Sequence, residues 1–212
     1  MTKQQTLTEV YLFRHAQTVV NTKPWLVGGR SNETELTPEG EEQARGLGRA
    51  LLRRGIIPQT VSASTAKRAI MTARLSLAEM GLDIEPTTHE EILELSQGDA
   101  EGRPRVEVYT PEVLAAIERE GKDFKLAGGE SMNEVGRRML DWMNQHFTGS
   151  AAEPGPHFVF THGGTIKYAA SSLLDWPRLQ TYETEIDNAT ANLFTHNGTL
   201  WHPTYLNRPA KT

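Results

Sequence analysis

Short apolar runs alternate with longer amphipathic segments along most of the chain. Residues 10–13, 59–65 and 157–160 are short runs bounded by polar residues, which predicts buried strands. The segments between them repeat apolar positions with the spacing of helices. Strands that alternate with helices favour a three-layer α/β/α sandwich, in which helices cover both faces of a mostly parallel central sheet.

Several predicted helices have recognisable end signals. One begins after Thr37, an N-cap residue followed by proline, and is closed by Gly55. The next helix ends at Gly81. Another begins at Ser131, because its hydroxyl and the carboxylate of Glu134 have the spacing of a capping box.

The C-terminal part predicts an antiparallel addition to the sheet. A helix over residues 165–174 is followed by two extended runs on either side of Asn197 and Gly198. An Asn-Gly pair between extended runs is a strong hairpin signal, so the sheet is expected to end in an antiparallel edge strand. Such an exposed edge would permit pairing with a second copy, as a homodimer.

The composition is that of one globular domain over residues 1–212. The chain is 37% hydrophobic and 23% charged, which suffices for one sizeable core. Residues 86–129 are irregular and rich in glycine, and they are predicted to be an inserted lid. The net charge is −5 and the 22 Lys and Arg are scattered, which argues against nucleic-acid and anionic-membrane partners.

Other classes of protein are excluded by what the sequence lacks. There is no cysteine, so thiolate nucleophiles, zinc–thiolate sites and disulfides are ruled out. The sequence shows neither a cleavable signal pattern nor an apolar run of about 18 residues. We therefore expect a soluble, cytoplasmic protein.

Two of the predicted strands each end in a histidine. VYLFRH ends at His15 and HFVFTH ends at His162. If both strands are parallel members of one sheet, their carboxyl ends lie on the edge where open α/β sheets bind ligands. Arg14 precedes the first histidine, and Arg68 lies in the first turn of the helix after residues 59–65. The four side chains are therefore expected to form one cation-rich pocket.

A pocket of this kind suits a phosphoryl group, because guanidinium groups match its oxygens in bidentate fashion. The arginines supply the charge that a metal ion gives in other phosphoryl-transfer sites, so we expect no metal and no cofactor. Asn21 and the turn at Gly28 and Gly29 could add neutral donors. Gly163 and Gly164 form a strand-to-helix turn, and the free amides of a helix N-terminus there would also favour an anion.

The same residue types suggest catalytic roles. An imidazole between two arginines is disfavoured as a cation, which leaves His15 a lone pair for attack on phosphorus. His162 would donate a hydrogen bond to the phosphoryl oxygens as they gain charge. The leaving oxygen needs a proton from a general acid. The acidic candidates are Glu90, Glu91, Glu94 and Glu101.

These motifs together resemble the histidine phosphatase superfamily, in its phosphoglycerate-mutase-like group. The family signature of Arg-His-Gly, with Asn seven residues after the Arg, is matched by RHAQTVVN, in which Ala16 replaces the Gly. Further similar segments follow in the family order, and the resemblance covers roughly residues 11–193. They are LTPEGEEQA, SASTAKRAIMTA, LELSQGDAEG, GGESMNEVGRR and FTHGGTIK.

The resemblance implies a covalent phosphohistidine on His15 and a set of phosphate contacts. These contacts come from Arg14, Arg68 and His162. It also implies a proton-donating carboxylate four residues before a glycine. Counting back from Gly98 selects Glu94, with Glu90 and Glu91 as the alternatives.

Three functions fit these residues. A phosphomonoester hydrolase would release phosphate from a small phosphorylated metabolite, whereas a cofactor-dependent mutase would return the group to a second hydroxyl behind a water-excluding lid. A non-catalytic module that only binds phosphorylated ligands is supported by Ala16 alone. The mutases that the sequence resembles have a fuller closing tail than the short, polar YLNRPAKT, so hydrolysis is favoured.

Overall fold

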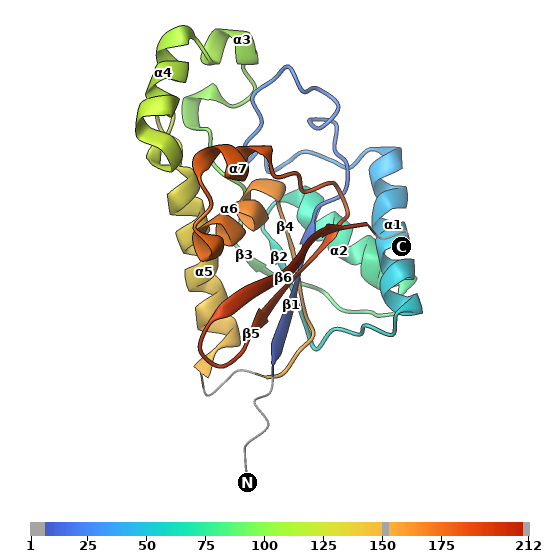
Figure 1. Ribbon diagram of the computed structural model, residues 1–212. Helices are drawn as coiled ribbons and strands as arrows, with labels where there is room; N and C mark the ends of the chain where they lie inside the picture. Colours follow the sequence, from blue (N-terminus) through green and yellow to red (C-terminus); the bar gives the residue numbers. More distant parts are fainter. Residues whose placement is uncertain (1–6, 150–152, 210–212) are drawn as a thin grey trace.

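Six strands form one central sheet. They are β1 (Thr8–Arg14), β2 (Thr60–Ser64), β3 (Thr87–His89), β4 (His157–Thr161), β5 (Ala191–His196) and β6 (Trp201–Arg208). The computed structural model describes residues 7–149 and 153–209. In it the strands lie in the order β3-β2-β4-β1-β5-β6 (Figure 1).

The direction of the strands agrees with the prediction. β1 and β2 each pair in parallel with β4, and β3 pairs in parallel with β2. β5 pairs antiparallel with β1, and β6 pairs antiparallel with β5. The hairpin turn is longer than the Asn197-Gly198 pair, because β5 ends at His196 and β6 begins at Trp201. Within the turn, the Asn197 N–H donates to the Leu200 carbonyl over 3.3 Å. The mostly parallel sheet with an antiparallel edge is confirmed, and the homodimer through that edge stays a prediction.

Four longer helices complete the three layers. They are α1 (Pro38–Arg53), α2 (Lys67–Glu79), α5 (Met132–Phe147) and α6 (Gly163–Leu174). α1 and α2 cover one face of the sheet, and α5 and α6 cover the other (Figure 1). No helix among residues 7–149 and 153–209 is long and apolar enough to cross a membrane.

The sheet separates two apolar cores because neighbouring strand residues point to opposite faces. Phe13 packs with Phe160 beneath α1 and α2, whereas Leu12 packs with Val159 beneath α5 and α6. Each of these side chains is fully buried. Burying a side chain of this size stabilises the fold by about 1.5–3 kcal/mol. Both faces of β1 and β4 are therefore held rigidly, and so are the residues at their ends.

The predicted helix caps are present. The Thr37 hydroxyl accepts the Gly40 N–H over 2.9 Å at the start of α1. Ser131 and Glu134 form a reciprocal capping box at the start of α5, with bonds of 3.1 and 2.8 Å. Each cap satisfies backbone donors that the first turn leaves open, which contributes about 1 kcal/mol.

The segment predicted as a lid differs from the prediction at its start. Its first residues form β3, an edge strand of the sheet, and Ile92 and Leu93 are buried in the core. The part that stands away from the sheet is built from short helices. These are η1 (Gly98–Ala100), α3 (Arg105–Val108), α4 (Pro111–Glu120) and η2 (Gly121–Asp123). A further short helix, α7 (Arg178–Glu183), lies beside α6 (Figure 1).

Candidate active site

The two histidines lie together at the carboxyl edge of the sheet. Arg14 ends β1 opposite Thr161, the last residue of β4, and the His15 N–H donates to the Thr161 carbonyl over 2.9 Å. His162 follows Thr161 directly, and the centroids of the two imidazole rings are 5.2 Å apart. The parallel register of β1 and β4 therefore brings these residues together as the sequence predicts.

His15 is buried with one ring nitrogen free. Its Nδ1 lies 2.8 Å from the carbonyl oxygen of Ala16, which can only accept, so Nδ1 carries the proton. Nε2 then holds the lone pair. Burial and the charges of Arg68 and Arg14 lower the pKa of His15 well below its usual 6.5, which outweighs the bond to Ala16. The ring is therefore a neutral imidazole with Nε2 available as a nucleophile.

Arg68 is held in place by a cage of carbonyl oxygens. Its Nη1 donates to the carbonyls of Arg30 and Ser31 over 2.6 and 3.0 Å, and its Nη2 lies 3.4 Å from the carbonyl of Gly29. Burial lowers the pKa of Arg68 to about 10, although Glu94 and Glu101 act in the opposite direction. The guanidinium still carries its charge at neutral pH and is fixed before any ligand binds.

His162 makes hydrogen bonds through both ring nitrogens. Its Nδ1 lies 3.0 Å from Arg68 Nη2 and its Nε2 lies 2.8 Å from the Ser64 hydroxyl. Because a guanidinium only donates, Nδ1 must be the acceptor and Nε2 the donor. Both nitrogens are thus occupied, the ring is completely buried, and it lines neither of the cavities described below. In this structure His162 contacts Arg68, and its hydrogen bond to the phosphoryl oxygens stays a prediction.

A cavity of about 170 Å³ lies over His15, and we call it the histidine cavity. Arg14, Arg68 and Asn21 also line it. Asn21 Oδ1 accepts two bonds from Thr18, at 2.9 and 3.0 Å, so its Nδ2 is left as a donor without a partner among residues 7–149 and 153–209. The cavity therefore combines a nucleophile with two guanidinium groups and an amide donor.

The glycines at 28 and 29 line the same cavity. Gly29 has a φ of 131°, and a Cβ at this position would overlap the Glu101 carboxylate. Glu101 accepts the N–H groups of Gln97 and Arg30 over 3.0 and 3.1 Å, and so holds this turn. The Gly29 carbonyl lies 3.4 Å from Arg68 Nη2, and the donors expected from this turn stay a prediction.

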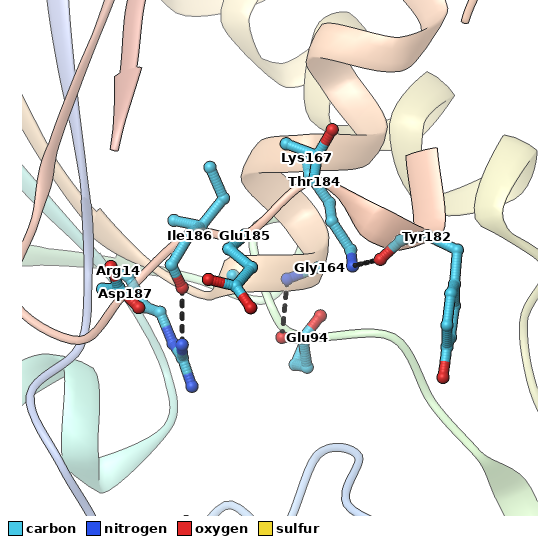
Figure 2. Close-up of a pocket in the computed structure, with 10 residues that line it drawn as sticks. Arg14, Glu94, Gly164, Lys167, Tyr182, Thr184, Glu185, Ile186 and Asp187 are labelled. Atoms are coloured by element: carbon cyan, nitrogen blue, oxygen red, sulfur yellow. Dashed lines mark hydrogen bonds between the residues drawn. The ribbon is translucent and has the colours of Figure 1, made fainter. Parts of the chain in front are cut away.

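Glu94 lies at the N-terminus of α6 (Figure 2). Its Oε2 accepts the Gly164 N–H over 3.0 Å and its Oε1 accepts the Leu95 N–H over 2.8 Å. A Cβ at Gly164 would overlap the carboxylate, so a larger residue at this position would force Glu94 to shift. Each carboxyl oxygen keeps a second lone pair for a proton. The Gly164 N–H thus binds a carboxylate within the protein, and an anion contact from the amide of Gly163 stays a prediction.

Glu94 joins the histidine cavity to a second cavity of about 340 Å³, the lysine cavity. Arg14 lines both cavities, and Lys167 lines the second (Figure 2). Gly163 also lines the second cavity. Among the acidic candidates, Glu90 and Glu91 are exposed and line neither cavity. The structure therefore places Glu94, and not its two neighbours, beside His15.

A model of the histidine phosphatase superfamily (branch 1) matches residues 10–209 of the sequence. The chain belongs to this superfamily. It is thus an enzyme of the phosphatase or mutase type, and the histidine cavity is the candidate active site of a histidine phosphatase superfamily member.

Relatives in the superfamily carry both kinds of name. The 2,3-bisphosphoglycerate-dependent phosphoglycerate mutase of Parvibaculum lavamentivorans is 28% identical over 159 residues, 74% of this chain and 75% of the mutase. The mutase of the same name from Methylobacterium radiotolerans is 34% identical over 132 residues, 61% of each chain.

Solved structures confirm the fold. A mycobacterial glucosyl-3-phosphoglycerate phosphatase superposes with a TM-score of 0.79 at 22% identity, covering 95% of this chain and 99% of its own. The alpha-ribazole phosphatase of Shigella flexneri gives a TM-score of 0.74 at 22% identity, covering 94% and 96%. At these identities the likeness shows the superfamily fold.

Ala16 replaces the glycine of the superfamily signature without strain. Its φ is not in the left-handed region, and its methyl group is fully buried in the core beneath α1 and α2. Its N–H donates to the Thr72 hydroxyl over 3.0 Å, and that hydroxyl donates to the Arg68 carbonyl over 2.7 Å. The alanine therefore packs as a core residue, and Thr72 links the backbone next to His15 to Arg68.

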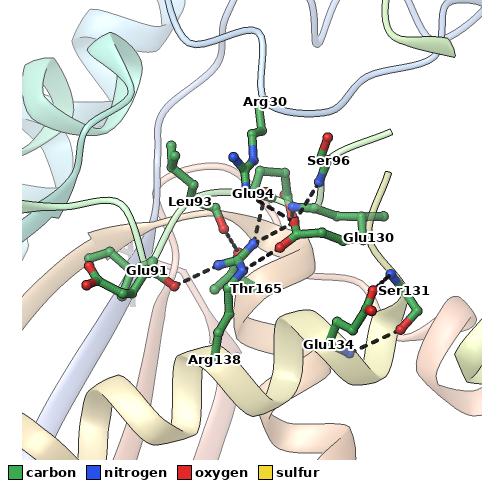
Figure 3. A network of polar contacts seen from close by, with 12 residues as sticks. Arg30, Glu91, Leu93, Glu94, Ser96, Glu130, Ser131, Glu134, Arg138 and Thr165 are labelled. Carbon is green, nitrogen blue, oxygen red and sulfur yellow. Dashed lines mark hydrogen bonds and ion pairs between the residues drawn. The ribbon is translucent and has the colours of Figure 1, made fainter. Parts of the chain in front are cut away.

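A charged network holds the loop that carries Glu94 (Figure 3). Arg138 on α5 donates to the carbonyls of Glu91 and Glu94 over 2.7 and 3.1 Å. It also pairs with Glu130, whose Oε2 accepts the Ser96 N–H over 2.9 Å. Burial opposes ionisation of Glu130, but Arg138, the Ser96 N–H and Arg30 lower its pKa overall.

Some site residues carry no sequence signal. The Asn188 amide donates to the His15 carbonyl over 2.9 Å and lies 3.4 Å from Asn21 Oδ1. It stands far from both in the chain, between α7 and β5, and only the fold brings it there. Lys167 lies in the FTHGGTIK segment, but its place beside Glu94 depends on the turn of α6.

Proposed function

We propose that this superfamily member is a phosphomonoester hydrolase that works through a phosphohistidine on His15. The observation that carries the proposal is the state of that imidazole. Its Nδ1 is bonded to Ala16, its pKa is held low by burial and by two arginines, and it lines a cavity with Arg14 and Arg68. A neutral nucleophile next to fixed positive charge is what attack on a phosphate ester requires.

The proposed reaction has two steps. In the first, His15 Nε2 attacks phosphorus, the bond from phosphorus to the ester oxygen breaks, and Glu94 as the acid gives its proton to that oxygen. In the second, water attacks the phosphohistidine, the nitrogen–phosphorus bond breaks, and the Glu94 carboxylate takes a proton from the water. Phosphate leaves, and both residues return to their starting states.

The arginines stabilise charge on the transferred group. Arg14 is anchored by its Nη1 bond to the Ile186 carbonyl over 2.5 Å, and Arg68 is anchored by its carbonyl cage. Because both groups are oriented before binding, little reorganisation is needed as the phosphoryl oxygens gain charge. Asn21 would add its Nδ2 as a neutral donor to the same oxygens.

The charge of the lysine cavity favours hydrolysis over mutase action. Glu94, Glu185 and Asp187 line it, against the two cations Arg14 and Lys167. A mutase of the phosphoglycerate type has to hold a substrate that carries a carboxylate and a second phosphate. Glu185 and Asp187, beside the proton-donating Glu94, would repel those groups.

The mutase names of the relatives make that activity the alternative to test. The wild-type protein is incubated with p-nitrophenyl phosphate and, separately, with 3-phosphoglycerate plus 2,3-bisphosphoglycerate. Hydrolysis predicts phosphate release from the first. Isomerisation of the second without phosphate release would establish the mutase instead, and phosphate binding without turnover would establish a binding module.

Two variants link the activity to the proposed residues. His15→Ala is expected to abolish turnover and the acid-labile labelling of the protein by ³²P, whereas His202→Ala, which changes an exposed histidine on β6, should leave both intact. Glu94→Gln is expected to slow the hydrolysis of alkyl phosphates by about 10²–10⁴-fold, since the glutamine side chain cannot supply the proton. Full labelling in His15→Ala would contradict the proposal.

A further inference from the structure

A third cavity, the lid cavity, lies between the lid helices and the helices that follow β4. It measures about 660 Å³, several times the histidine cavity. Residues of α3, α4, η2, α6 and α7 line it, and Figure 1 shows α3 and α4 standing beyond the end of α5. Cavities of this size hold molecules much larger than a three-carbon acid.

The walls of the lid cavity are mainly apolar and aromatic. The principal side chains are Tyr109, Leu114, Ile117, Phe124, Tyr168 and Tyr182. Several remain open to solvent, since Leu114 is 50% exposed and Tyr182 is 58% exposed. Apolar surface left in water around a hollow favours an apolar occupant.

Within the part of the chain that the structure describes, the four basic residues that line the lid cavity are already engaged, and one of them, Lys167, donates to a backbone carbonyl. Lys125 pairs with Glu134 over 2.7 Å, and Arg178 pairs with Glu118. Arg105 lies over the ring of Tyr109, 4.8 Å from its centroid. These partners make the cavity a poor site for a second phosphate and leave the rings and aliphatic side chains as its main recognition surface.

The lid cavity continues the candidate active site. Lys167 and Tyr182 line both the lid cavity and the lysine cavity, in which Glu94 lies. Lys167 donates to the Tyr182 carbonyl over 3.2 Å and lies 5.7 Å from the ring centroid of Tyr168. Leu95, the residue after Glu94, also lines the lid cavity. A group attached to the oxygen that Glu94 protonates can therefore extend past these residues into it.

We infer that the lid cavity holds the alcohol part of the substrate, and that this part carries an aromatic or extended apolar group. The inference rests on the proposed hydrolase function and names its substrate class. It makes Ile117 and Tyr182 specificity-determining residues. Small polar esters such as phosphoglycerate would leave the cavity unfilled and would be turned over less efficiently.

The test compares phenyl phosphate with 4-phenylphenyl phosphate, whose leaving groups have similar acidity. The wild-type protein is expected to prefer the larger ester by about 10–100-fold in kcat/KM, mainly through KM, because a second ring is buried. Ile117→Asp places a charge in the cavity wall and should reduce the preference for the larger ester to within about threefold. The kcat/KM for phenyl phosphate should not change.

Ala115→Asp is the matched control, because it adds the same charge to α4 outside the cavity lining and should keep the preference. No residue of α4 is fully buried, so neither variant should unfold, and thermal unfolding checks this. Equal kcat/KM values for the two esters in the wild type, or a preference that survives Ile117→Asp, would overturn the inference.

Failure of the proposed hydrolase function can be distinguished from failure of the inference about the lid cavity. If neither ester is hydrolysed, the hydrolase proposal is wrong. Calorimetric measurement of the affinity for each ester then shows whether the lid cavity binds an aromatic ligand. Tighter binding of the larger ester, lost in Ile117→Asp and kept in Ala115→Asp, would still support an aromatic ligand there. Equal binding of the two esters would reject it.

Discussion

Arg68 Nη2 donates to His162 Nδ1 over 3.0 Å, and this bond fixes the state of both groups. The acceptor nitrogen of His162 must be unprotonated, so its other nitrogen donates to Ser64 over 2.8 Å. An arginine on α2 therefore sets the tautomer of a histidine after β4, and the hydroxyl of a strand-end serine on β2 accepts the proton of the other ring nitrogen. The chain of bonds ends at the guanidinium that faces the histidine cavity.

Removing His162 is expected to impair the site through Arg68. In His162→Ala the guanidinium loses its imidazole acceptor, and kcat/KM should fall by about 10²–10³-fold, as for loss of one preorganised charge contact. Ser64→Ala removes the hydrogen bond between Ser64 and His162, which is worth about 1 kcal/mol, and should lower kcat/KM by about fivefold. Steady-state kinetics and the inhibition constant of inorganic phosphate measure both. Unchanged phosphate inhibition in His162→Ala would show that His162 does not position Arg68.

The two buried histidines are expected to make the fold sensitive to acid. Burial and the charge of Arg68 lower the pKa of His15 and of His162 well below 6.5, whereas both should titrate near 6.5 in the unfolded chain. Below that pH the unfolded state binds protons that the folded state excludes. The free energy of unfolding should therefore fall as the pH drops below about 6.5, by up to about 1.4 kcal/mol per pH unit for each histidine.

Urea unfolding at a series of pH values between 7.5 and 5 measures this slope. In the double variant His15→Asn, His162→Asn the free energy of unfolding should depend less steeply on pH. The difference in slope should correspond to the uptake of up to two protons. His202→Asn, at an exposed position on β6, should keep the wild-type slope. An unchanged slope in the double variant would mean that other groups cause the acid sensitivity.

Arg138 is expected to act on catalysis by positioning Glu94. Arg138→Ala removes the bonds to the carbonyls of Glu91 and Glu94 and the pair with Glu130, so the loop that carries the acid should loosen. We expect kcat for alkyl phosphates to fall by about 10–100-fold. With p-nitrophenyl phosphate the loss should be smaller, because that leaving group departs without a proton.

Arg137→Ala is the control for this variant, since the neighbouring arginine on α5 is exposed. Arg137→Ala should hydrolyse both alkyl phosphates and p-nitrophenyl phosphate at wild-type rates. The leaving-group dependence separates positioning from general destabilisation, because a merely unstable protein would lose activity toward both substrates equally. An equal loss in Arg138→Ala would therefore contradict a role for Arg138 in placing the acid.

Elements with chemical signals at their ends were predictable from sequence. The Thr37 cap and the Ser131–Glu134 capping box are local, so the starts of α1 and α5 are where the pattern indicates. β3 was missed because its three residues are polar or partly exposed and it is defined by pairing with β2. α7 was missed because six residues carry too little periodicity to predict a helix.

The candidate site was predictable to the extent that strand ends determine it. Parallel pairing of β1 and β4 places His15 beside His162, and the apolar runs before them indicate that pairing. The bond between His162 and Arg68 was not predictable, because it depends on the orientation that the carbonyls of the loop near Gly29 give to Arg68. Such a loop has no periodic pattern from which its backbone path could be read.

Ala16 is expected to matter for stability more than for catalysis. Ala16→Gly restores the superfamily signature but removes a methyl group that is fully buried in the core beneath α1 and α2. The lost burial costs about 0.8 kcal/mol, and the added freedom of the unfolded glycine about 0.5–1 kcal/mol. Because Ala16 does not adopt a left-handed φ, the substitution relieves no strain. Urea unfolding should thus show a loss of about 1–2 kcal/mol, with kcat/KM within about threefold of wild type. A gain in kcat/KM of tenfold or more would show instead that the methyl group obstructs the site and would favour a decayed binding module.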